Sequence, residues 1–131
     1  MAAYLAIAAT DEGSKLTAAL ESSPFMYTIT TIPGYPAQTF MNSQTISVDP
    51  NFNPVLYTTD GQQVASTEVI LEHELGHAVT GLPDEGPINV IDEVENPFRA
   101  ELGLPYRIAY PAVAMQPFGS PPYNSFQLPP L

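Results

Sequence analysis

The sequence contains no cysteine and only three basic residues, Lys15, Arg99 and Arg107. Without thiols the chain forms no disulfides, thiolate metal sites or cysteine nucleophiles. Its 14 acidic residues leave a formal net charge of -11 at pH 7, and a chain this acidic repels nucleic acid and anionic membranes. No apolar run approaches the length that spans a membrane. We therefore expect a soluble protein that binds neither nucleic acid nor a membrane.

The 131 residues are the natural length of one domain. The start of the chain, MAAYLAIAAT, is apolar but short and has no basic segment, so it is not typical of a Sec signal peptide. We expect a protein that is secreted or delivered without a cleaved Sec signal peptide, or that is cytoplasmic before delivery.

The order of apolar, β-branched and helix-breaking residues predicts an α+β domain. Helices are expected over residues 10–20, from Ser66 or Thr67 to a stop at Gly81 and Pro83, and from between residues 89 and 96 to 102. Extended segments are expected over residues 25–32, 39–48 and 55–59, with a turn over 60–63. Seven of the 15 prolines lie at or after Pro105. This predicts a domain over residues 1–110 and an extended proline-rich tail over 111–131.

Both histidines of the chain, His73 and His77, lie in the short segment HELGH. Residues four apart share one helix face, so both imidazoles can bind one ion. Neutral imidazole suits Zn²⁺, and three protein ligands with one water form a catalytic site. Glu74 can reach the metal-bound water as a general base. Gly76 indicates close packing against a neighbouring element, because glycine weakens a helix interior. The alternative is a surface helix with two incidental histidines.

The sequence offers several candidates for the third metal ligand. Glu95 is favoured, as a glutamate from a following helix, and Arg99 on the same helix face could orient its carboxylate. Asp84 lies one residue beyond the metzincin spacing, where this chain has proline, and Asp92 is a further alternative. Asp92 and Glu95 also have the spacing of a capping box, so Glu95 could simply close the start of a helix.

Three segments, ISVDPN, VILEHELGHA and VENPFRAELGLPYRIAY, resemble a group of bacterial effector-type zincins. This group includes type III secreted effector metallopeptidases of enteropathogens and related toxin-domain zincins. The resemblance covers residues 46–110 and implies a minimal, gluzincin-like zincin domain. Such a domain has a small, mostly antiparallel sheet, an edge strand that holds an extended substrate, an HExxH helix and a second C-terminal helix. It also implies His73 and His77 as zinc ligands and Glu74 as the catalytic base.

Further residues match the E-N-x-x-R-x-E-x-G-L-P-x-R-x-x-Y element of that group. Asn96 and Arg99 are candidates for orienting a metal ligand. Arg107 and Tyr110 of this element, with the adjacent Tyr106 outside it, are candidates for stabilising the oxyanion that forms when a carbonyl is attacked. The favoured interpretation of Arg107 and Tyr110 is structural, with both side chains packing the tail against the body of the domain.

Two functions follow from this sequence. The first is a zinc-dependent metalloendopeptidase of bacterial or phage origin, an effector or toxin that acts on a protein or peptide substrate. The alternative is a non-catalytic zincin-fold subunit, held in a larger assembly through the proline-rich tail, with zinc as a structural ion. Glu74 argues against the alternative, because a purely structural site does not need a general base.

Overall fold

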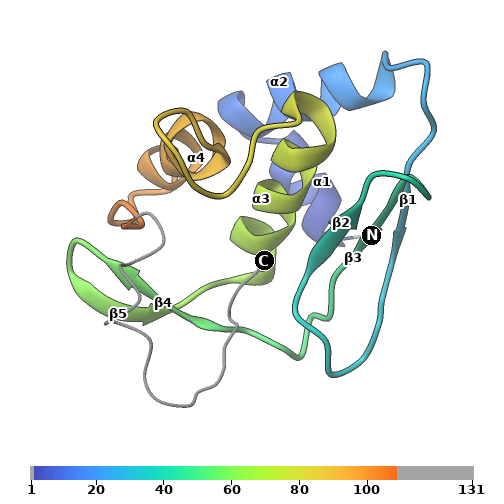
Figure 1. Ribbon diagram of the computed structural model, residues 1–131. Coiled ribbons are helices and arrows are strands. Elements are labelled where there is room, and N and C mark those ends of the chain that lie inside the picture. The colour runs from blue at the N-terminus through green and yellow to red at the C-terminus, as the bar shows by residue number, and fades with distance from the viewer. Residues whose placement is uncertain (1, 109–131) are drawn as a thin grey trace.

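Helix α3 (Thr67–Thr80), which carries both histidines, lies at the centre of the structure (Figure 1). The structure is a computed structural model that describes residues 2–108. Ser66 caps the helix, because its side chain accepts a hydrogen bond from the backbone N–H of Val69. Gly81 ends the helix in the left-handed conformation, with a φ of 70°. The helix expected around HELGH is confirmed, including both of its ends.

Three further helices pack around α3. They are α1 (Ala2–Ala8), α2 (Asp11–Glu21) and α4 (Asn96–Glu101), and a π-helical turn over Ile91–Glu95 leads directly into α4. Helix α2 begins where expected. Thr10 caps it, because its side chain accepts a hydrogen bond from the backbone N–H of Gly13. The helix predicted to end at residue 102 is also confirmed. Helix α1 was not predicted; it buries Ile7 fully. None of the described helices is long and apolar enough to cross a membrane.

Two small sheets complete the described part of the chain (Figure 1). The strands are β1 (Thr28–Thr30), β2 (Gln38–Phe40), β3 (Thr45–Ser47), β4 (Val55–Thr58) and β5 (Gly61–Val64). In the first sheet β3 is central, parallel to β1 and antiparallel to β2. Strands β4 and β5 form an antiparallel hairpin. The α+β class with a mostly antiparallel sheet is therefore confirmed, and β2 is an edge strand.

Two segments differ from the expected strands. Residues 39–48, expected as one extended run, instead form β2 and β3 around a turn in which Gln44 has a φ of 53°. Residues 60–63 were expected to form a turn, but the chain reverses at Asp60 and continues as β5. Strand β5 is polar and is held by its ladder with β4, so no apolar alternation reveals it. The expected tail, 111–131, lies outside the described residues.

The core lies between α3 and the elements around it. Its buried side chains are Ile7, Leu16, Ala37, Ile46, Val48, Val69, Leu71, Leu75, Val90, Ile91, Val94 and Phe98. Helix α3 approaches its neighbours closely at Gly76, where a Cβ atom would lie 2.6 Å from Cγ2 of Val90 and 2.9 Å from Cγ1 of Val94. The close packing predicted for Gly76 is therefore present, and it holds the turn that carries Glu95 against the histidine helix.

Candidate metal centre

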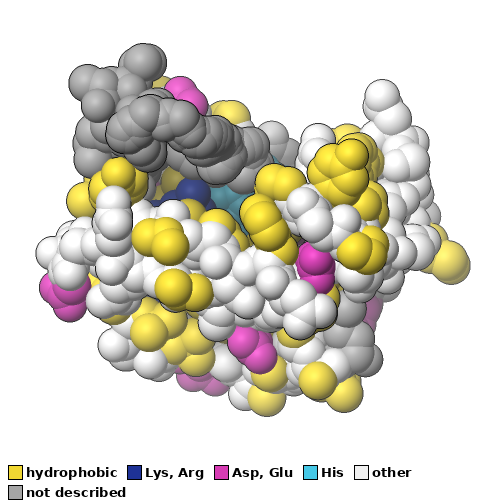
Figure 2. All heavy atoms as spheres, turned by 90° about the horizontal axis from the view of Figure 1, so that it is seen from below, with side chains coloured by type: hydrophobic (Ala, Val, Ile, Leu, Met, Phe, Trp, Pro, Cys, Tyr) yellow, Lys and Arg dark blue, Asp and Glu magenta, His cyan; other side chains and the backbone are white. Residues whose placement is uncertain are grey.

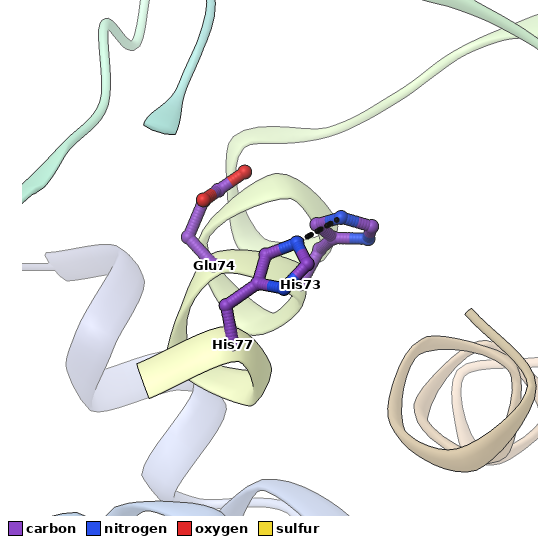
Figure 3. Close-up of side chains that lie close together, drawn as sticks. All are labelled: His73, Glu74 and His77. Carbon is purple, nitrogen blue, oxygen red and sulfur yellow. Dashed lines mark hydrogen bonds between the residues drawn. The ribbon is translucent and has the colours of Figure 1, made fainter. Parts of the chain in front are cut away.

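The imidazole rings of His73 and His77 meet on one face of α3 (Figure 3). Their Nε2 atoms are 3.1 Å apart, and the rings meet edge to face with centroids 4.8 Å apart. The Oδ1 atom of Asp84, in the loop after α3, lies 2.8 Å from Nε2 of His73 and 2.9 Å from Nε2 of His77. Three potential ligand atoms therefore face one another.

The other nitrogen of each ring has an oxygen acceptor. Nδ1 of His73 lies 2.7 Å from Oε1 of Glu95, and Nδ1 of His77 lies 2.8 Å from the carbonyl oxygen of Leu82. When the rings are neutral, both acceptors favour a proton on Nδ1, which leaves a lone pair on each Nε2. Two lone pairs and a carboxylate oxygen repel one another unless a proton or a metal ion lies between them. The donor set fits Zn²⁺, because nitrogen and oxygen ligands of a tetrahedral zinc site lie about 3.3 Å from one another.

The pKa values of His73 and Asp84 favour a positive charge between the two histidine rings and the Asp84 carboxylate. Burial lowers the pKa of His73, but hydrogen bonds to Asp84 and Glu95 outweigh burial and raise the pKa to about 9. Burial likewise opposes ionisation of Asp84, yet hydrogen bonds from both histidines hold its pKa well below the usual range. The site is therefore arranged to hold a cation, and a metal ion that binds there must compete with a proton.

Glu95 is fully buried beneath His73 and contacts two arginines. Nε of Arg99 donates to its Oε2 at 2.7 Å, and Nη1 of Arg107 donates to its Oε1 at 2.9 Å. Burial favours the neutral carboxyl group, but the charge of Arg107 and the hydrogen bond with His73 hold the pKa of Glu95 well below its usual range. A carboxylate in this position fixes the orientation of an imidazole and raises its basicity.

Glu95, the favoured third ligand, does lie beside His73, but it contacts Nδ1 of that ring. It does not lie at the point where the two Nε2 atoms meet. Asp84, the less favoured alternative, lies there instead. Asp92 accepts a hydrogen bond from the Asn89 side chain at 3.0 Å. Arg99 contacts the Glu95 carboxylate as its helix position suggested.

The remaining candidates lie around the end of the described chain. The Asn96 side chain accepts from the backbone N–H of Arg107 at 2.7 Å and donates to its carbonyl oxygen at 3.1 Å. The guanidinium group of Arg107 is buried, and its Nη1 donates to Oε1 of Glu95. Tyr106 is exposed, and Tyr110 lies outside the described residues.

Glu74 lies beside this centre and is almost fully buried. One of its carboxylate oxygens lies within 4.8 Å of ring nitrogens of both His73 and His77. Burial raises the pKa of Glu74. Its Oε1 is 2.7 Å from the hydroxyl oxygen of Thr39 in β2. Figure 2 shows histidine atoms and basic side-chain atoms in a recess of the surface, next to hydrophobic side chains. A carboxylate this close to the centre can exchange a proton with a water held there.

No protein-family model matches the sequence, and no curated protein is similar to it. Among solved structures, the zinc metalloprotease effector GtgA of Salmonella matches with a TM-score of 0.55 and a sequence identity of 19%. The chain shares the fold of GtgA. The match covers 77% of this chain and 59% of the GtgA chain, so the present chain spans less than two thirds of that neighbour. At this identity the likeness concerns the fold alone, and it supports the zincin-like architecture expected from the sequence.

Proposed function

We propose that the protein is a zinc-dependent metallopeptidase in which His73, His77 and Asp84 hold the metal and Glu74 is the general base. One observation carries the proposal. Two imidazole Nε2 atoms and a carboxylate oxygen converge beside a buried glutamate. The shared fold with a zinc metalloprotease effector supports it. In this proposal Glu95 orients His73 instead of binding zinc, and Asp84 takes the place that the sequence favoured for Glu95.

Glu74 and Glu95 have different roles in the proposed hydrolysis. Bound zinc would act as a Lewis acid and lower the pKa of a water at the site. Glu74 accepts a proton from the attacking water and donates it to the amine that leaves. The burial that raises the pKa of Glu74 suits a group that must hold this proton for part of the reaction. Glu95, fixed by two arginines, orients the His73 ring through Nδ1 and so leaves Nε2 facing His77 and Asp84, where it would hold the metal.

The proposed substrate is a protein or peptide in an extended conformation. Strand β2 lies at the edge of its sheet, and its residue Thr39 contacts Glu74. An edge strand offers free backbone groups to which an extended peptide can add as a further strand. The proposal that the protein is a bacterial effector or toxin has the support of the GtgA likeness. Cleavage of a partner protein is the activity that such a role requires.

The decisive experiment combines metal analysis with hydrolysis. We expect about one zinc per chain in untagged protein and hydrolysis of an unfolded protein substrate that stops when a chelator is added. Glu74→Gln should keep its zinc and lose about 100-fold or more of the activity, since it removes a general base. Glu93→Gln, at an exposed position, is the matched control and should behave as the parent.

Two results would contradict the proposal in different ways. If Glu74→Gln cleaves as fast as the parent, Glu74 is not the base. If the parent holds zinc but cleaves no substrate in a broad peptide library, the alternative of a non-catalytic binding subunit is favoured.

A further inference from the structure

Thr39 connects the edge strand β2 to the buried glutamate of the metal centre. Its Oγ1 atom lies 2.7 Å from Oε1 of Glu74 and 2.8 Å from the backbone carbonyl oxygen of the same residue. The backbone of Thr39 is paired with Ile46 in the middle strand of the sheet, and Ile46 is fully buried. The backbone that carries the hydroxyl group is therefore held by the sheet.

We propose that Thr39 is a positioning residue for Glu74, and that its hydroxyl holds the carboxylate at the metal centre. This inference rests on the proposed peptidase function. A glutamate side chain has three rotatable bonds and can occupy many rotamers. Within residues 2–108 the hydrogen bond to the Glu74 carboxylate comes from Thr39. Loss of this bond would leave a buried carboxylate free to turn away from the ring nitrogens of His73 and His77.

A hydroxyl suits this position because it both donates and accepts. When Glu74 is ionised, the Thr39 hydroxyl donates to Oε1. When Glu74 holds a proton, its own O–H donates to Oγ1 of Thr39, and the hydroxyl can then donate to the backbone carbonyl of Glu74 at 2.8 Å. Both forms of the base thus find a partner at the same place, and the carboxylate need not move as the proton arrives and leaves.

The simpler interpretation is that Thr39 only packs β2 against α3. Two substitutions separate the interpretations. Thr39→Val keeps the shape of the side chain and removes the hydroxyl, whereas Thr39→Ser keeps the hydroxyl and removes the methyl group. A packing role predicts that serine is the more harmful change. A positioning role predicts that valine is the more harmful change.

The experiment measures kcat, KM, zinc content and the thermal midpoint of the parent and both variants on one peptide substrate. For Thr39→Val we expect kcat to fall about 10- to 100-fold, the effect of losing a hydrogen bond to a charged group, with KM and zinc content unchanged. Thr39→Ser should restore kcat to near the parent value. Equal losses in both variants, or a change in KM alone, would overturn the proposal.

Crystal structures of the parent and Thr39→Val provide a readout that needs no activity. The Glu74 carboxylate should leave its position beside the ring nitrogens in Thr39→Val and keep it in Thr39→Ser. An unmoved carboxylate in Thr39→Val would overturn the positioning role. Failure of the peptidase proposal itself would be seen in different experiments. Glu74→Gln would keep full activity, or the parent would contain no zinc.

Discussion

At the scale of single residues, Asp84 and Glu95 both present a carboxylate to His73, and they differ in the ring nitrogen that each contacts. Asp84 shares one oxygen between the Nε2 atoms of His73 and His77. Glu95 contacts Nδ1 of His73 and is itself held by two buried arginines. The first position lets a carboxylate bind the ion, whereas the second lets it set the orientation and basicity of a ligand.

Substitution of these two acids should therefore have different effects on zinc. Asp84→Ala removes one of three proposed ligand atoms and should abolish stoichiometric binding. Glu95→Gln should retain zinc with an affinity about 10- to 100-fold lower, as for other carboxylates that orient a ligand. It should also lower the free energy of unfolding by about 3–5 kcal/mol, because two buried arginines lose their counter-charge.

Competition with a chromophoric chelator measures the affinities, and urea unfolding measures the stabilities. Asp92→Ala is the matched control, since Asp92 is exposed and accepts a hydrogen bond from Asn89. If Glu95→Gln loses zinc while Asp84→Ala keeps it, the third ligand is Glu95, as the sequence favoured, and not Asp84.

The sequence could predict only part of this centre. Helix periodicity places His73, Glu74 and His77 on adjacent turns, because their spacing fixes their angles around α3. Asp84 follows the left-handed Gly81, in a loop where the Leu82 carbonyl turns back to His77. No periodic rule gives the position of a side chain in such a loop. The position of Asp84 relative to the two histidines therefore could not be read from the sequence.

At the scale of elements, the contact between α3 and the segment that carries Glu95 depends on Gly76. The valines at 90 and 94 fill the space where a side chain at 76 would lie. This packing was predictable from a glycine inside an apolar helix. By contrast, no serine, threonine, aspartate or asparagine precedes α1 to mark its start, and the turn between β2 and β3 contains neither glycine nor proline. Those elements depend on tertiary contacts that the local sequence does not reveal.

We expect Gly76→Ala to destabilise the protein, although alanine is the better helix former by about 1 kcal/mol. Overpacking against Val90 and Val94 should cost about 1–3 kcal/mol and outweigh that gain. Urea unfolding measures the loss. In the Gly76→Ala background, Val90→Ala should cost less than it does alone, because it frees the space that the new methyl group needs. Strictly additive losses would show that the two positions do not compete for this space.

At the scale of the whole molecule, the distribution of charge is uneven. The chain has a net charge of -11 and three basic residues. Arg99 and Arg107 are buried around Glu95, while Lys15 is exposed near Glu12. Self-repulsion of an acidic surface opposes the compact state. A divalent cation bound by His73, His77 and Asp84 would lie close to the buried Glu74 and would offset part of that repulsion.

Zinc should therefore stabilise the fold as well as supply chemistry. A metal that binds only the native state adds about 2.7 kcal/mol of stability when its free concentration is 100 times its dissociation constant. We expect a chelator to lower the thermal midpoint of the parent. His77→Ala should show no such shift, because a proposed ligand is missing. In Glu74→Gln the chelator should lower the thermal midpoint as much as in the parent, because Glu74 is proposed to exchange a proton with water and not to bind the metal. A chelator shift that disappears in Glu74→Gln would instead make Glu74 a ligand, and the proposed base would have to be sought elsewhere.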